Sequence, residues 1–142
     1  MISNIEKVLF LKDVELFAGI SGEEIQHIAP ITEEVEFPPQ HSIFLEGDSG
    51  NSLYLIVSGE VRVHLGNQEL ARLGPKACFG EMALLDAAPR SATVTSLTPL
   101  HLLRINQTDF FEILTEKPEI SHGIIKTLTQ RLRKANKKNE IH

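Results

Sequence analysis

Apolar residues recur every three or four positions in two short stretches near the amino terminus. They fall within residues 5–11 and 23–31, and this spacing gathers them on one face of a helix. Ser21 precedes the second stretch, with Glu24 three positions later, which is the arrangement of a capping box at a helix N-terminus. The pattern therefore predicts two short helices at the start of the chain.

From residue 42 onward the apolar positions change to a spacing of two, which is typical of β-strands. Residues 53–57 are apolar on both faces, whereas residues 61–65 alternate apolar and polar side chains ahead of the turn signal Gly66-Asn67. Other strand-like segments, separated by glycine, proline and polar turns, are residues 43–45, 70–73, 92–95 and 100–105. Many short strands with regular turns predict a β-sandwich or a barrel-like roll.

The last part of the chain returns to helical spacing. A helix is predicted from Thr108 and Asp109, which can cap it, through Leu114, and Pro118 lies beyond its end. A longer amphipathic helix is predicted from about residue 119 to residue 138, and its apolar face comprises Ile120, Ile124, Ile125, Leu128 and Leu132. Its basic end is interpreted as a solvated helix terminus, where cations suit the helix dipole.

Composition narrows the class of protein. The chain has 142 residues, of which 42% are hydrophobic and 23% charged, and these values suit one globular domain. No apolar run approaches the roughly 18 residues of a membrane span, and no secretory signal is visible, so we expect a cytoplasmic protein without membrane insertion. The net charge of −5 argues against a general affinity for nucleic acid.

Cys78 is the only cysteine and is interpreted as a small buried apolar residue.

Candidate chemistry is concentrated between residues 79 and 94. Gly80 permits a close approach of the backbone, and residues 81–85 favour a helical turn whose free N–H groups can face an anion. Arg90 adds a positive charge with fixed parallel donors. Glu81 would repel an anion but suits a hydroxyl group that donates hydrogen bonds. An anion beside a hydroxyl group indicates a phosphate and a sugar, and therefore a nucleotide.

This segment resembles the phosphate-binding cassette of cyclic nucleotide-binding domains. That family includes bacterial catabolite activator proteins, regulatory subunits of cyclic-AMP-dependent protein kinase and cyclic-nucleotide-gated channels. The Phe-Gly-Glu triplet, the small-aliphatic run, Pro-Arg and the small residues after it fill every slot of the cassette. The resemblance implies a mainly β fold with flanking helices, in which a double-stranded β-helix, or jelly-roll-like β-roll, spans about residues 33–105. Helices would follow over about residues 107–138, so that residues 1–142 form a single cyclic nucleotide-binding domain.

The resemblance also implies the residues of a ligand site. Arg90 would pair with an exocyclic oxygen of the cyclic phosphate, and Glu81 would accept a hydrogen bond from the ribose 2′-hydroxyl. The expected ligand-binding residues are Gly80, Glu81, Met82, Ala83, Arg90, Ser91 and Ala92. The base would be covered from the last helix of this or a neighbouring protomer, for which the candidates are Arg131, Ala135 and Asn136, with Leu128 and Leu132 as alternative apolar lids. Cyclic AMP is the preferred ligand over cyclic GMP.

The expected function is a regulatory module that senses a cyclic nucleotide and moves its flanking helices, without catalysis, metal or cofactor. The six histidines are scattered and form no His-X-His pair, which argues against a metal-dependent enzyme. No helix-turn-helix follows the last helix, so direct nucleic-acid binding is not expected from this chain. The output would pass to a homodimer partner or to a fused or separate effector domain.

Three alternatives remain open at this point. The chain can be a fragment of a larger transcription regulator or transporter. It can be a degenerate module that keeps the fold and serves only for docking, although the presence of both Glu81 and Arg90 argues against this. Outside a binding site, Arg90 would be a surface residue that forms an ion pair with Glu81 or Asp86.

Overall fold

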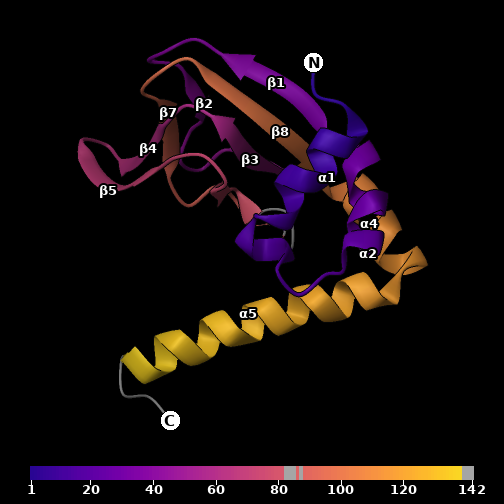
Figure 1. Ribbon diagram of the computed structural model, residues 1–142. Coiled ribbons are helices and arrows are strands. Elements are labelled where there is room, and N and C mark those ends of the chain that lie inside the picture. Colours follow the sequence, from indigo (N-terminus) through magenta and orange to yellow (C-terminus); the bar gives the residue numbers. More distant parts are fainter. Residues whose placement is uncertain (82–85, 87, 139–142) are drawn as a thin grey trace.

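The computed structural model describes residues 1–81, 86 and 88–138. Figure 1 shows a roll of β-strands with the helices gathered along one side of it and the long helix α5 as the last element. In chain order the elements are α1 (Asn4–Lys12), η1 (Glu15–Phe17), α2 (Gly22–Ile28), η2 (Ala29–Ile31), β1 (Glu33–Phe37), β2 (Ser42–Phe44), β3 (Ser52–Ser58), β4 (Val61–Leu65), β5 (Gln68–Leu73), β6 (Cys78–Phe79), β7 (Thr93–Ser96), β8 (Leu100–Asn106), α4 (Gln107–Glu116) and α5 (Pro118–Lys138).

The described strands form two antiparallel sheets that face each other. Their orders are β1-β8-β3-β6 and β2-β7-β4-β5, so each sheet joins strands that are far apart in the sequence. Between the sheets lies an apolar cluster that includes Ile56, Val61, Phe79 and Val94, and it holds the two layers together. The predicted mainly β fold with helices at both ends is confirmed.

The central strand β3 is apolar on both faces because each face packs against a different layer. Tyr54 and Ile56 point into the cluster between the sheets, whereas Leu53 and Leu55 belong to a second cluster under the helices. Its neighbour β8 has the same arrangement, since Leu102 lies between the sheets and Leu103 lies under the helices. The continuous apolar run predicted at residues 53–57 is therefore that of a strand buried on both sides.

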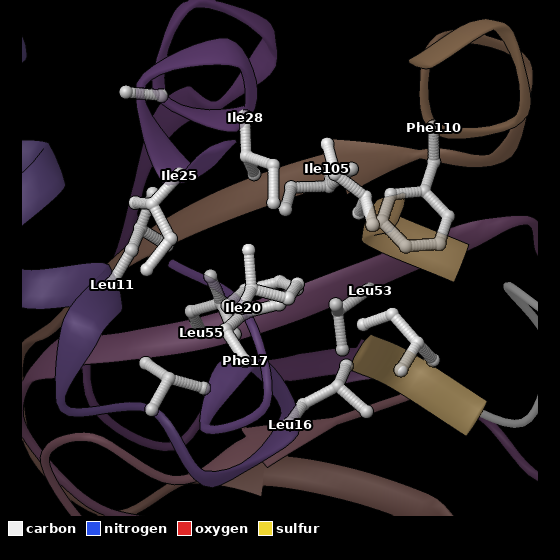
Figure 2. Close-up of a cluster of buried hydrophobic side chains, with 14 of the residues drawn as sticks. Leu11, Leu16, Phe17, Ile20, Ile25, Ile28, Leu53, Leu55, Ile105 and Phe110 are labelled. Atoms are coloured by element: carbon white, nitrogen blue, oxygen red, sulfur yellow. The ribbon is translucent and has the colours of Figure 1, made fainter. Parts of the chain in front are cut away.

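The second cluster joins the helices to the roll, as Figure 2 shows for its labelled side chains. Phe17, Ile28 and Phe110 come from η1, α2 and α4 and converge on the outer face of β3 and β8. From α5, Ile120 and Ile124 are buried in the same cluster. By contrast, Ile125 is 59% exposed and Leu132 is 61% exposed, so only part of the predicted apolar face of this helix packs against the domain.

Some element boundaries differ from the predictions. Strand β1 precedes the first strand predicted from the pattern at residue 42, because its alternating Glu and apolar residues form an edge strand beside β8. The N-cap of α4 is Asn106 rather than Thr108 or Asp109, and its Oδ1 accepts a hydrogen bond from the Asp109 backbone N–H at 3.0 Å. Ser21 caps α2 as predicted, but Glu24 does not complete the predicted capping box, because its carboxylate accepts from the Ser21 hydroxyl at 3.0 Å. That helix ends at Ile28, however, because Pro30 cannot donate the next helical hydrogen bond.

No helix in the described part of the chain combines the length and the apolar character that a membrane crossing requires.

Candidate functional site

A cavity of about 580 Å³ opens between the inner face of the second sheet and the loop that precedes β7. Its volume lies within the range of roughly 300–1,000 Å³ that is usual for small-molecule sites. One side is apolar and comes from the strands, and the other side carries the polar groups of the loop. The lining residues are Phe44, Val63, Leu73, Cys78, Phe79, Gly80, Glu81, Asp86, Ala88, Pro89, Arg90, Ser91, Ala92 and Val94.

Arg90 is the buried cation of this cavity, with only 6% of its surface exposed. Its Nη2 donates to the Ser52 carbonyl oxygen at 3.0 Å, and its Nη1 donates to the Gly80 carbonyl oxygen at 3.3 Å. The guanidinium carbon also lies 4.1 Å from the centre of the Phe44 ring, which is a cation–π distance. Arg90 is therefore buried, and the alternative interpretation of it as a surface residue in an ion pair with Glu81 or Asp86 is wrong. Two strand ends hold its side chain in place.

The backbone of Arg90 is fixed as firmly as its side chain. The Arg90 N–H donates to the Asp48 carbonyl oxygen at 2.9 Å, and the Arg90 carbonyl accepts from the Gly47 N–H at 2.8 Å. These bonds join the loop before β7 to the loop between β2 and β3. The arginine is consequently positioned by the roll itself.

One donor of the Arg90 guanidinium is left without a hydrogen-bond partner among the described residues. This donor is Nε, which is buried. Burial lowers the pKa of Arg90, against the opposing effects of Tyr54 and Asp48, yet an arginine stays charged at neutral pH. A buried donor without a partner costs about 1–3 kcal/mol.

Gly80 is required by the close approach of this arginine. Its φ of +82° lies in the left-handed region, which glycine adopts without strain. A Cβ at this position would lie 2.6 Å from Nη1 of Arg90 and 2.9 Å from the Ser52 carbonyl oxygen. Any side chain here would therefore disturb the guanidinium and the backbone beside it.

Glu81 connects the cavity to the last helix through Arg131. Nη1 of Arg131 lies 3.9 Å from Oε1 of Glu81, and Nε of Arg131 donates to Oε1 of Glu15 in η1 at 3.0 Å. Burial by itself would lower the pKa of Arg131, but the hydrogen bond and the negative charge of Glu15 outweigh it and raise the pKa. One guanidinium on α5 thus contacts both η1 and the polar side of the cavity.

Cys78 lies in β6 on the wall of the cavity and packs against the cluster under the helices. Burial raises the pKa of its thiol to about 11, and the negative charge of Glu81 adds to the effect. The thiolate is the reactive form of cysteine, so this residue is poorly suited to redox chemistry. These surroundings agree with the interpretation of Cys78 as a small apolar residue with a packing role.

The cavity brings together most of the residues expected to bind the ligand. Gly80, Glu81, Arg90, Ser91 and Ala92 all line it, whereas Met82 and Ala83 lie outside the described residues. Among the candidates for covering the base, Arg131 lies beside Glu81, but the described lining of the cavity includes neither Ala135 nor Asn136. Leu132 is largely exposed, whereas Leu128 packs against the cluster under the helices.

Sequence reasoning missed the apolar wall of the cavity and the partner of Arg131. Val63 and Val94 follow the alternation of their strands, so this pattern could have placed them on the inner face. The cation–π contact of Phe44 and the ion pair of Glu15 join positions far apart in the chain. No local pattern signals such contacts.

The described residues contain no group of three or more His, Cys, Asp or Glu side chains arranged to hold a metal ion. The polar groups of the cavity instead suit an organic anion with hydroxyl groups, because they combine one guanidinium with carboxylate and hydroxyl side chains.

Comparison with known proteins identifies the family. The sequence profile of the cyclic nucleotide-binding domain matches residues 34–117, which is more than half of the chain and includes both the roll and the cavity. The chain belongs to the cyclic nucleotide-binding domain family. This finding confirms the resemblance noted in the sequence.

Relatives in the family include regulatory proteins from bacteria and eukaryotes. The chain is 37% identical over 131 residues to the cyclic AMP receptor protein of Thermus thermophilus, and the match covers 89% of this chain and 61% of that protein. The N-terminal domain of a transcriptional regulator from Streptomyces coelicolor has a TM-score of 0.82 at 33% identity, with 94% of both chains covered. The regulatory domain of Toxoplasma gondii PKA, solved with cAMP, has a TM-score of 0.71 at 29% identity, with 78% of this chain and 44% of that chain covered.

The two bacterial comparisons differ in how much of the relative is matched. The chain spans only 61% of the length of the Thermus receptor protein. It covers nearly all of the solved Streptomyces domain, which is described as the N-terminal domain of a regulator. The correspondence therefore concerns the cyclic nucleotide-binding domain of such proteins.

Proposed function

We propose that this chain senses a cyclic nucleotide, and that it prefers cyclic AMP to cyclic GMP. The observation that carries the proposal is the buried Arg90 guanidinium on the wall of the cavity, with an unpartnered Nε. Within a cyclic nucleotide-binding domain, a fixed arginine in a cavity of this size suits the cyclic phosphate. The name of the Thermus relative and the cAMP bound to the Toxoplasma domain support cyclic AMP.

In the proposed complex, Arg90 pairs with an exocyclic phosphate oxygen and Glu81 accepts from the ribose 2′-hydroxyl. The remaining proposed contacts are Gly80, Met82, Ala83, Ser91 and Ala92, with Arg131, Ala135 or Asn136 near the base. Glu81 can accept a hydrogen bond from the ribose only if Arg131 leaves one of the Glu81 carboxylate oxygens free. The 3.9 Å separation between these two side chains is long enough to allow this.

We further propose that residues 1–142 form one domain with no catalysis of its own. The relatives named above are regulatory proteins, and this supports the assignment. A cytoplasmic location and an effector in a dimer partner or another domain remain predictions from the sequence.

Ligand binding is proposed to move the flanking helices α4 and α5. The contact of Arg131 with both Glu15 and Glu81 supplies a physical route, because a ligand that competes for Glu81 changes the balance of charges on α5. Amide hydrogen exchange, measured by mass spectrometry with and without saturating cyclic AMP, should therefore differ in the segment Pro118–Lys138. Identical exchange in this helix, together with proven binding, would exclude the switch.

A thermal-shift series tests the proposed function. Cyclic AMP should raise the melting temperature in a concentration-dependent manner, because a ligand that binds only the folded state stabilises it. Cyclic GMP should give a smaller shift at equal concentration. Linear 5′-AMP is the control and should give little shift. Equal shifts with both cyclic nucleotides would contradict the preference, and no shift with either would contradict the function.

A further inference from the structure

The guanidinium of Arg90 lies in a slot that is bounded by two glycines. Gly80 borders Nη1, as described above, and Gly50 borders Nη2 and Nε. A Cβ on Gly50 would be 2.6 Å from Nη2 and 2.8 Å from Cζ of Arg90, and it would also meet Nε. Such separations are too short for real Cβ contacts, so the slot accommodates the guanidinium only while position 50 carries no side chain.

The backbone of Gly50 does not itself demand glycine. Gly47, Gly59, Gly66 and Gly80 have a positive φ, whereas Gly50 does not. Alanine at position 50 therefore avoids the strain of a left-handed φ. The constraint at position 50 comes from the arginine, which separates the effect of a substitution here from ordinary backbone strain.

The contacts of Arg90 show what a side chain at position 50 would displace. The atoms in its way are the guanidinium carbon and nitrogens, and these same groups donate to Ser52 and Gly80 and stack on the Phe44 ring. Moving the guanidinium away from Gly50 would weaken these interactions together. The group would then no longer meet an anion in the cavity with its present geometry.

We propose that Gly50 is a positioning residue for ligand binding, which sets the location of the Arg90 guanidinium through the absence of a side chain. The proposal rests on the proposed function, in which Arg90 binds the cyclic phosphate. It assigns a binding role to a loop residue outside the cassette that contains Gly80, Glu81 and Arg90.

The test compares Gly50→Ala with Gly74→Ala. Gly74 also has an ordinary φ, and a Cβ there meets nothing closer than 4.0 Å, so it is a matched control. Calorimetric titration should show that Gly50→Ala weakens cyclic AMP binding about tenfold, which corresponds to one distorted charge-assisted hydrogen bond. Gly74→Ala should change the affinity by less than about twofold, a difference within a few tenths of a kcal/mol.

Two further measurements separate positioning from a general structural role. In an Arg90→Ala background, adding Gly50→Ala should change the affinity little, because the guanidinium that the new methyl group would meet is already absent. In the ligand-free protein, the NMR resonance of the Arg90 Nε–H group, assigned by its loss in Arg90→Ala, should shift in Gly50→Ala but not in Gly74→Ala.

The outcomes distinguish this inference from the proposed function. Wild-type protein that binds neither cyclic nucleotide overturns the proposed function and, with it, the role of Gly50 in binding. If wild-type protein binds but Gly50→Ala binds equally well, the inference alone is overturned. An equal loss of affinity in the wild-type and Arg90→Ala backgrounds, or an unmoved Nε–H resonance, also overturns it.

Discussion

Replacing Arg90 with alanine should weaken cyclic AMP binding about a hundredfold. The substitution removes the buried guanidinium from the cavity, and charge-assisted hydrogen bonds of this kind contribute about 1.5–3 kcal/mol. Lysine should restore little of the affinity, because its single ammonium cannot reproduce two fixed parallel donors. Calorimetric titration of Arg90→Ala and Arg90→Lys measures both effects.

The control for this experiment is Arg72→Ala. Arg72 is exposed on β5, pairs with Glu69 at 3.0 Å and does not line the cavity, so its loss should leave the affinity unchanged. Arg90→Ala also deprives the Ser52 and Gly80 carbonyls of a donor, and circular dichroism must therefore show that the variant is folded. A folded Arg90→Ala protein with wild-type affinity would refute the role assigned to this arginine.

The second large effect is expected at Gly123, where α5 meets the segment after η1. A Cβ on Gly123 would lie 2.6 Å from the Gly19 carbonyl oxygen, 3.0 Å from its carbon and 2.9 Å from Cγ1 of Ile20. Backbone atoms cannot rotate away, so Gly123→Ala should force α5 outward and lower the free energy of unfolding by about 2 kcal/mol. Urea denaturation measures this loss.

Gly22→Ala provides the matched comparison for Gly123→Ala. Gly22 begins α2, and a Cβ there would meet only the side chain of Lys12, at 3.6 Å. Alanine has a higher helix propensity than glycine by up to about 1 kcal/mol, so this variant should be slightly more stable than wild type. If Gly123→Ala is also more stable, the close packing of α5 on Gly19 is refuted.

The strand that could be predicted best from the sequence is one that is buried on both faces. Residues 53–57 are apolar throughout, and β3 is buried on both faces as this run implies. Strand β1 was less visible in the hydrophobic pattern, because an edge strand with alternating Glu residues needs its partner β8 to fix it. The resemblance to the family, rather than the pattern, placed the start of the roll near residue 33.

Helix ends and helix faces were predicted less well for a physical reason. Asn106, Thr108 and Asp109 are all good N-cap residues, and the last hydrogen bonds of β8 decide which of them ends the strand and caps α4. Ile125 and Leu132 extend the apolar pattern of α5, yet the domain covers only the side that carries Ile120 and Ile124. Periodicity identifies an apolar face but not how much of it is packed.

The candidate site also has one part that could be predicted from the sequence and another part that could not. Gly80, Glu81 and Arg90 lie close together in the sequence, and their chemistry could be interpreted from one short segment. Phe44 on β2 and Gly50 in the loop before β3 lie against Arg90 although they are some forty residues away in the sequence, and Glu15 reaches Arg131 over more than a hundred residues. Such contacts depend on tertiary packing, so the sequence alone gave no sign of them.

Calorimetric titration of the wild-type protein with cyclic AMP tests the central claim most directly. A ligand of about 22 non-hydrogen atoms gains roughly 0.3 kcal/mol per atom, which corresponds to a Kd around the micromolar range. We predict saturable binding at one site with an affinity of that order. The absence of saturable binding up to millimolar concentrations of both cyclic AMP and cyclic GMP would contradict the account.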